Sequence, residues 1–263
     1  MSFYLDRPLN LAHKGASHEA PGNTLAAFLL ARELGADGVE LDVQLSRDGT
    51  PVVIHDATVE ATTDGHGRVR AMTLAELKAL DAGSWFDPVY AGQRIPTLQE
   101  VVDALGPGLL INIELKTVSG KDDGLASAVV RLVEENHLLD RVVISSFNPL
   151  ALWRVRRLNP WIPVGMLYCD GLPFFLSRPW LRHLVRPEAL HPDWTLVDDG
   201  LVRWARKRGY RVHTWTVDDP GKMWQLVEAG VDLIITNRPD LLRQVLEAGP
   251  APGEAPVPGR EGK

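Results

Sequence analysis

The chain has 263 residues, of which 45% are hydrophobic and 24% charged, and its formal net charge is −6. These fractions exclude wholesale disorder, and the slight acidity argues against a dedicated nucleic-acid-binding protein, which usually carries a basic face. A single cysteine, Cys169, excludes an intramolecular disulfide framework and cysteine-rich zinc sites. No stretch approaches the roughly 18 apolar residues of a membrane helix, and residues 1–10 lack the apolar core of a signal peptide, so we expect a cytoplasmic protein.

Short strand-like runs and longer helix-like segments alternate along most of the chain. This alternation is typical of βα units that build a parallel sheet. Asn23 is predicted to cap the first helix, and the similar segments around Gly35 and Gly230 indicate that one αβ unit recurs, as in a barrel. We expect strands at 8–13, 38–45, 51–55, 109–115, 142–146, 163–167, 188–190, 211–215 and 232–235, and helices at 23–34, 97–105, 122–136, 149–158, 173–184, 198–208, 219–229 and 239–247.

The second and third predicted strands are too close in sequence for a parallel crossover. Five residues separate 38–45 from 51–55, whereas a crossover needs about a dozen or more. Asp48-Gly49 is a tight-turn signal, so 51–55 should return antiparallel beside 38–45 and bring His55 near Asp42. Eight parallel strands then remain, and the predicted fold is an α/β protein, a (β/α)8 TIM barrel.

Two segments fall outside this alternation. Residues 57–96 are punctuated by glycines and contain one helix-like stretch at 74–80, so we interpret them as a small insertion at the C-terminal rim of the barrel. Residues 249–263 are rich in proline, glycine and glutamate, and we expect them to form a mobile tail. Residues 1–248 are expected to form a single domain.

Acidic side chains interrupt two of the apolar strands. Glu40 and Asp42 are two residues apart and therefore face the same side of their strand, and Glu114 and Lys116 repeat this pattern. Polar residues at the C-terminal ends of barrel strands are typical of active sites. Glu40, Asp42 and Glu114 together suit a hard divalent cation such as Ca²⁺ or Mg²⁺, while a buried salt-bridge network around Lys116 remains the alternative.

Two histidines end predicted strands at the same rim. His13 and His55 could act as an acid and a base around one substrate, although a structural role is the alternative for each. Trp215, at the end of a later strand, could form a wall for a small polar substrate, with Trp85-Phe86 of the insertion opposite; core packing explains them equally well. The apolar stretch at 173–184 is expected to be a barrel helix packed on the sheet rather than a lipid- or partner-binding helix.

An ordered series of short motifs runs from about Leu9 to Leu242. It resembles the glycerophosphodiester phosphodiesterase family, and the resemblance covers nearly the whole chain. The motifs are His13-Lys14-Gly15, Pro21-Gly22-Asn23-Thr24, Gly38-Val39-Glu40-Leu41-Asp42-Val43, Arg47-Asp48-Gly49, Val52-Val53-Ile54-His55-Asp56, Ile95-Pro96-Thr97-Leu98, Ile113-Glu114-Leu115-Lys116, Ser145-Ser146-Phe147, Thr214-Trp215-Thr216-Val217 and Thr236-Asn237-Arg238-Pro239.

The resemblance implies a (β/α)8 barrel that hydrolyses glycerophosphodiesters to sn-glycerol 3-phosphate and an alcohol. It implies His13 and His55 as the acid/base pair and Lys116 as a phosphate contact, a role we extend to Lys14. It also implies that one divalent cation, Ca²⁺ or Mg²⁺, is bound by Glu40, Asp42 and Glu114.

This chain departs from the family pattern at two positions. Lys14 stands where the family usually has arginine, and Gly22 stands where it usually has glutamate. An arginine fork can grip two phosphate oxygens, whereas a lysine offers a point charge. We therefore expect Lys14→Arg alone to leave turnover unimproved, because the glutamate that would support the arginine is absent.

Three other functions fit parts of the pattern. The same chemistry could act on lysophospholipids, as in a lysophospholipase D. Lys116 could form a Schiff base in a barrel lyase or aldolase. The barrel could also bind its ligand without turnover. No repeat or heptad marks a partner helix, so the sequence leaves the oligomeric state open.

Overall fold

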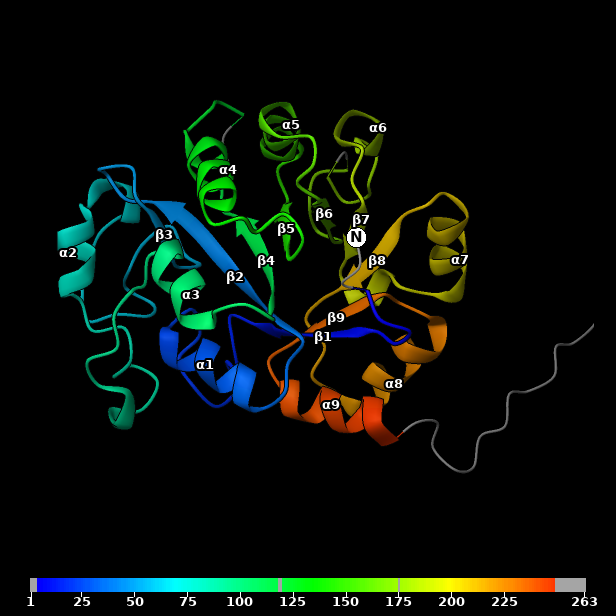
Figure 1. The fold of residues 1–263 in the computed structure, drawn as a ribbon, viewed down its shortest axis with the longest axis horizontal. Coiled ribbons are helices and arrows are strands. Elements are labelled where there is room, and N and C mark those ends of the chain that lie inside the picture. The colour runs from blue at the N-terminus through cyan, green and yellow to red at the C-terminus, as the bar shows by residue number, and fades with distance from the viewer. Residues whose placement is uncertain (1–3, 118–119, 175, 249–263) are drawn as a thin grey trace, which may run out of the picture.

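The computed structural model describes residues 4–117, 120–174 and 176–248. Within these ranges eight parallel strands close into a barrel, because β1 pairs with β9 on one side and with β2 on the other (Figure 1). The expected (β/α)8 TIM barrel is therefore confirmed. Its strands are β1 (Leu9–His13), β2 (Gly38–Leu45), β4 (Leu110–Leu115), β5 (Val142–Ser146), β6 (Val164–Tyr168), β7 (Ala189–Pro192), β8 (Arg211–Thr214) and β9 (Leu233–Thr236).

The remaining strand, β3 (Pro51–Val53), lies antiparallel against β2, as the short link between them predicts. Val43 pairs with Val53, and the Ile54 amide donates to the Asp42 carbonyl at 2.9 Å. Gly49 turns the chain with a φ of +82°, a conformation that costs glycine little. The hairpin carries His55 back toward the acidic strand.

Helices cover the outside of the barrel. They are α1 (Leu25–Glu33), α3 (Leu98–Leu105), α4 (Leu125–Glu135), α5 (Pro149–Leu158), α6 (Arg182–Val185), α7 (Asp199–Lys207), α8 (Pro220–Ala229) and α9 (Pro239–Ala248). Alternate side chains of β2 point to opposite faces of the strand. Val39, Leu41 and Val43 pack in the main apolar core, while Glu40 and Asp42 lie on the other face. The fold thus turns both carboxylates into the barrel. No helix in the described ranges has the length and apolar character needed to cross a membrane.

Two predictions about helices are wrong. The cap of α1 is Thr24, whose side chain accepts from the Ala27 amide; Asn23 sits one residue earlier with a φ of +61°. The predicted helix at 173–184 shrinks to the four residues of α6, because Pro179 in its middle has no N–H for helical hydrogen bonding. Phe174 and Trp180 are exposed rather than packed on the sheet, and Phe175 lies outside the described residues.

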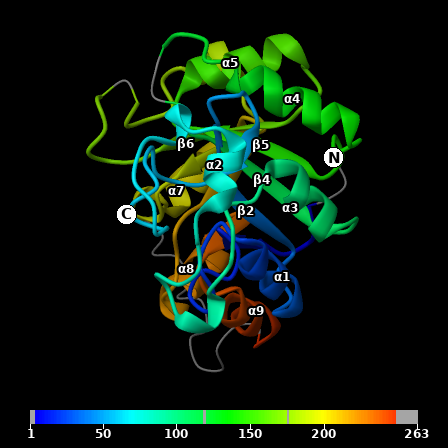
Figure 2. The same ribbon diagram turned by 90° about the vertical axis from the view of Figure 1, so that its left-hand side faces the viewer.

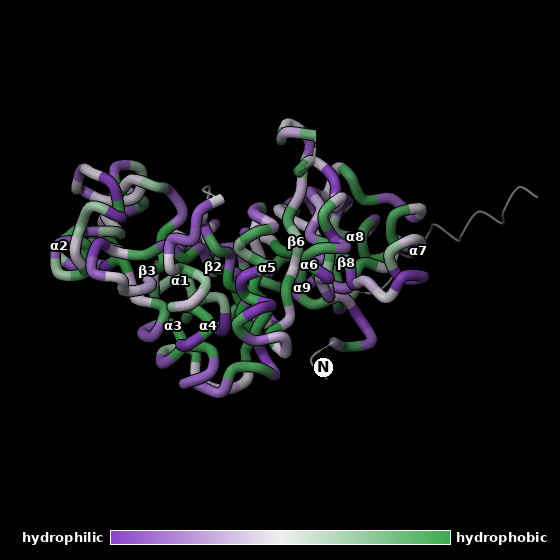
Figure 3. Tube along the Cα trace, turned by 90° about the horizontal axis from the view of Figure 1, so that it is seen from above, coloured by the Kyte–Doolittle hydropathy of each residue, from purple (hydrophilic) through white to green (hydrophobic). Residues whose placement is uncertain are grey.

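Residues 57–96 leave the barrel between β3 and α3, and Figure 2 shows this insertion facing the viewer. It contains 3-10 turns η1 (Val69–Ala71) and η2 (Pro88–Tyr90) and the helix α2 (Leu74–Ala79), which begins with a capping box at Thr73. Its own apolar cluster includes Val59, Val69 and Leu77. Seen from above, the same segment stands to one side of the apolar barrel strands (Figure 3). The predicted tail at 249–263 lies outside the described residues.

Candidate active site

Three carboxylates converge inside the C-terminal end of the barrel. Asp42 on β2 pairs in register with Glu114 on β4, and Glu40 lies two residues earlier on the same face of β2. Carboxylate oxygens of all three residues lie within 4.8 Å of one another, although each residue is at most 9% exposed. Like charges held this close in a buried place require compensation.

Two lysines compensate only part of this charge. The Lys116 ammonium is 2.9 Å from Glu114 Oε1 and 3.4 Å from Asp42 Oδ1. Lys14 Nζ is 4.0 Å from Asp42 Oδ2, and Asn23 Nδ2 donates to the same oxygen at 2.8 Å. Three carboxylates and two ammonium groups leave an excess of negative charge. The salt-bridge network that was the alternative to a cation is therefore present, but it does not neutralise the cluster.

The pKa shifts show which carboxylates carry the uncompensated negative charge least easily. Burial, together with Asp42 and Glu114, raises the pKa of Glu40 well above its ordinary value, and burial and Asp42 raise the pKa of Glu114 to about 7. Burial alone would also raise the pKa of Asp42, but Lys116 and Lys14 hold it below its ordinary value. Asp42 Oδ1 is buried and accepts no hydrogen bond among the described residues. A set of hard oxygen donors in this state fits a divalent cation such as Ca²⁺ or Mg²⁺.

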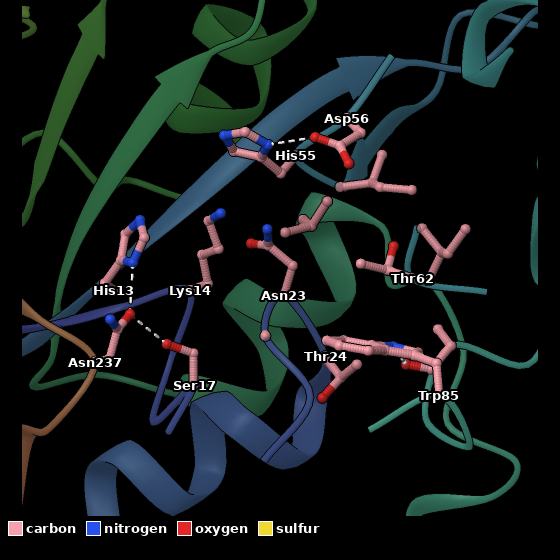
Figure 4. Close-up of a pocket in the computed structure, with 15 residues that line it drawn as sticks. His13, Lys14, Ser17, Asn23, Thr24, His55, Asp56, Thr62, Trp85 and Asn237 are labelled. Carbon is pink, nitrogen blue, oxygen red and sulfur yellow. Dashed lines mark hydrogen bonds and ion pairs between the residues drawn. The ribbon is translucent and has the colours of Figure 1, made fainter. Parts of the chain in front are cut away.

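The two predicted histidines stand on either side of this cluster. His13 ends β1, with Nδ1 2.7 Å from Asn237 Oδ1 and Nε2 3.9 Å from Glu40 Oε2. Burial and the Lys14 ammonium lower the pKa of His13 to about 4. His55 follows β3, and its Nδ1 is 2.7 Å from Asp56 Oδ1. Figure 4 shows both imidazoles at the same cavity, with Lys14 and Asn23 beside them.

Comparison with known proteins decides the family. Residues 13–241 match the model of the glycerophosphoryl diester phosphodiesterase family. The chain belongs to this family. This confirms the family and the enzyme class that the motifs imply.

The relatives of this phosphodiesterase family member span nearly its whole length. A glycerophosphodiester phosphodiesterase of Caldanaerobacter subterraneus is 44% identical over 246 residues, covering 92% of this chain and 99% of the relative. A glycerophosphodiester phosphodiesterase of Bacillus subtilis is 34% identical, covering 91% of this chain and 87% of the relative. Among solved structures, an Oleispira antarctica phosphodiesterase in complex with sn-glycerol-3-phosphate has a TM-score of 0.84 at 34% identity, covering 92% of this chain and 97% of that one.

Aromatic side chains form walls around the acidic cluster of this phosphodiesterase family member. A cavity of about 180 Å³ holds Glu40, Glu114 and Lys116, together with Phe147 and Trp215. The two rings meet edge to face at 5.5 Å, and the Trp215 indole donates to the His191 carbonyl at 2.9 Å. Trp215 is therefore placed where the sequence predicts a wall.

A second cavity of about 340 Å³ lies on the side of the insertion. Both His13 and His55 line it, and Trp85 closes its far side (Figure 4). Phe86 packs edge to face on Trp85 at 5.7 Å and is absent from the cavity lining. Only the tryptophan of the expected Trp85-Phe86 wall reaches the site.

Sequence reasoning assigns no role in the site to three polar residues that contact the predicted ones. Asn23, predicted only as a helix cap, donates its side-chain amide to Asp42. Asp56 Oδ1 lies 2.7 Å from His55 Nδ1, and Asn237 Oδ1 faces His13 Nδ1. Asn237 directly follows β9, as His13 ends β1, so its place at the rim was the available signal. What could not be seen was which neighbour it contacts.

The departure at position 22 has a local geometric consequence. A Cβ added at Gly22 would lie 3.1 Å from Lys14 Cβ and 3.4 Å from Ser17 Cβ. With no carboxylate at position 22, the Lys14 ammonium has Asp42 as its nearest acidic partner. Lys14 itself has a φ of +57°, and its amide donates to Glu40 Oε2 at 3.1 Å. The backbone of Lys14 thus holds one predicted cation ligand while its side chain faces another.

Proposed function

We propose that this protein hydrolyses glycerophosphodiesters to sn-glycerol 3-phosphate and an alcohol, with one divalent cation, Ca²⁺ or Mg²⁺, bound by Glu40, Asp42 and Glu114. The observation that carries the proposal is a cluster of three buried carboxylates, two of which, Glu40 and Glu114, line one cavity together with His13 and His55. The product bound in the Oleispira antarctica relative supports the same substrate class.

Each side chain has a chemical task in this reaction. A divalent cation, when bound, supplies a positive centre that polarises a phosphoryl oxygen. Lys116 and Lys14 provide ammonium donors for the other phosphate oxygens. One histidine takes the proton of the attacking hydroxyl, and the other protonates the leaving alkoxide. The imidazoles line the same cavity from β1 and from the β3 end, so they can approach one phosphate from two sides.

The two cavities suit the two halves of a small diester. Phe147 and Trp215 form walls for the glycerol moiety in the 180 Å³ cavity beside the carboxylates. The 340 Å³ cavity between the histidines and Trp85 accepts the leaving alcohol. A glycerophosphodiester with a compact head group is therefore the proposed substrate. A lysophospholipid, which carries an additional acyl chain, is the alternative.

The environment of Lys116 disfavours Schiff-base chemistry. Burial alone would lower the pKa of this ammonium, but Glu114 and Asp42 raise it above its ordinary value. A Schiff-base lysine must present a neutral amine, which needs the opposite shift. Phosphate binding, which uses the charged form, is the role consistent with this geometry.

Replacing each histidine tests the proposal. His13→Ala and His55→Ala are each expected to lower kcat/KM by at least about 10²-fold, measured as sn-glycerol 3-phosphate release from glycerophosphocholine. His183→Ala, an exposed histidine of α6, is the matched control and should behave as wild type. Near-normal turnover by either site variant would contradict the assignment. Faster release from the acylated analogue would identify a lysophospholipase D instead.

A further inference from the structure

A chain of hydrogen bonds runs behind His13, across three neighbouring strands of the rim. His13 ends β1, Asn237 follows β9, and Asp218 lies in the loop after β8. His13 Nδ1 is 2.7 Å from Asn237 Oδ1, and Asn237 Nδ2 donates to Asp218 Oδ2 at 2.6 Å. The Ser17 hydroxyl also donates to Asn237 Oδ1, at 2.7 Å. Figure 4 shows the inner part of this chain, from His13 through Asn237 to Ser17.

The polarity of this chain is set at its outer end. A carboxylate offers only acceptors, so the amide of Asn237 must turn its NH₂ toward Asp218 and its carbonyl oxygen toward His13. An acceptor at that place requires that His13 carries its proton on Nδ1. The neutral ring then presents Nε2, without a proton, toward the acidic cluster, where it lies 3.9 Å from Glu40 Oε2.

We propose that Asp218 is a positioning residue that fixes the tautomer of His13 through Asn237. The proposal rests on the proposed function, in which the Nε2 of His13 exchanges a proton with the substrate. Asp218 lines neither of the two cavities described above, so its effect on the reaction passes through the side-chain amide of Asn237. An active-site histidine held by an outer carboxylate loses orders of magnitude in kcat when the tautomer is wrong.

A purely structural role is the competing explanation. Asp218 Oδ1 also accepts from the backbone N–H of Asn237 at 2.8 Å and from the Thr236 hydroxyl at 2.9 Å, so it ties its loop to the end of β9. Asp218→Asn keeps an oxygen for both of these donors. Its new NH₂ group, however, would face the NH₂ group of Asn237. The clash is relieved if Asn237 turns over, which places its NH₂ against His13 Nδ1 and favours the Nε2–H tautomer.

Exchanging the two side chains separates these explanations. In the double variant Asp218→Asn/Asn237→Asp, the carboxylate at position 237 accepts from His13, from Ser17 and from the amide at position 218. The net formal charge of the pair is that of the wild type, and His13 Nδ1 again faces a hydrogen-bond acceptor. A positioning role therefore predicts a loss of activity in Asp218→Asn and rescue by the second substitution, whereas a role confined to the loop predicts little loss in either variant, because asparagine keeps the acceptor for both loop donors.

The experiment compares wild type, Asp218→Asn and the double variant as full-length, cation-loaded proteins. Asp218→Asn is expected to lower kcat by about 10-fold to 10³-fold with KM changed less than about threefold, and the double variant is expected to recover to within about fivefold of wild type. NMR of ¹⁵N-labelled imidazoles reports the tautomer directly, with the His13 signals identified by their absence in His13→Ala. We expect Nδ1–H in wild type and in the double variant, and Nε2–H in Asp218→Asn.

Asp219→Asn is the matched structural control. Asp219 is the neighbouring carboxylate, and it caps α8 by accepting from the Lys222 amide at 2.8 Å. Asparagine caps a helix about as well as aspartate, so this variant should keep the melting temperature, kcat and the His13 tautomer close to those of the wild type.

Two results would overturn the proposal: an Nδ1–H tautomer that persists in Asp218→Asn, or equal loss of activity in the single and double variants. The activity of His13→Ala keeps this test apart from the proposed function. If His13→Ala turned over normally, the catalytic role of His13 would be wrong, while the NMR measurement would still decide whether Asp218 controls the tautomer.

Discussion

Binding of a divalent cation is expected to release protons from the acidic cluster, and the affinity is therefore expected to fall as the pH is lowered. In the cation-free protein the pKa of Glu114 is raised to about 7, and that of Glu40 is raised well above its ordinary value. A carboxylate must be ionised to bind Ca²⁺ or Mg²⁺, so any proton on these groups competes with the cation.

The raised pKa of Glu114 sets the smallest effect. A competing group with a pKa of about 7 is almost fully ionised near pH 8 and almost fully protonated near pH 6. Competition at this one site lowers the apparent affinity by about tenfold between these two pH values. Glu40 steepens the dependence, because it also gives up a proton when the cation binds. Asp42, whose pKa is below its ordinary value, adds nothing in this range.

Isothermal titration calorimetry measures both the affinity and the protons released. EDTA-stripped protein would be titrated with CaCl₂ at about pH 6, 7 and 8, each in two buffers of different ionisation enthalpy. Glu114→Gln should bind more weakly and release fewer protons near pH 7, whereas Glu135→Gln, an exposed residue of α4, should match wild type. An affinity independent of pH with no proton release would refute the placement of the cation among these carboxylates.

Three further outcomes follow from single contacts. Asn23→Ala removes the amide bonded to Asp42 and should weaken cation binding by about 10-fold to 100-fold in the same titration; unchanged affinity would exclude Asn23 as an orienting residue. Lys14→Arg should leave kcat/KM no higher than wild type, since no carboxylate at position 22 supports the guanidinium, and a clear gain would contradict this. Burial lowers the pKa of His191 to about 3. Below pH ~6.5 this histidine is therefore protonated in the unfolded state but stays neutral in the folded state. The free energy of unfolding should therefore fall by about 1.4 kcal/mol per pH unit from this residue below that pH, and urea titrations at two pH values should show a smaller fall for His191→Leu.

Local sequence rules predicted the features that depend on spacing. The five-residue link after β2 allowed only a hairpin, and the alternation of β2 placed Glu40 and Asp42 on one face; the structure contains both. The prediction of a helix at 173–184 was wrong because it gave apolar periodicity more weight than Pro179, which lacks the N–H for helical hydrogen bonding.

The contacts that orient the site depend on tertiary register. His13 and Asn237 are 224 residues apart in sequence, and they meet only because β9 lies beside β1 in the closed barrel. Asp218 reaches Asn237 from the next strand end in the same way. The position of Asn237 at a strand end is visible in the sequence, but neither its contact with His13 nor the role of Asp218 follows from a local pattern. The residues proposed to act on the substrate were therefore easier to predict than those that orient them.

The most direct test of the central claim is product formation by metal-stripped protein. EDTA-treated, folded protein would be incubated with glycerophosphocholine alone, with Ca²⁺ and with Mg²⁺, and sn-glycerol 3-phosphate would be measured over time. We expect release only after a cation is added, and none above background from Asp42→Asn under the same conditions. Full turnover without a divalent cation, or no turnover by the folded protein under any of these conditions, would contradict the account.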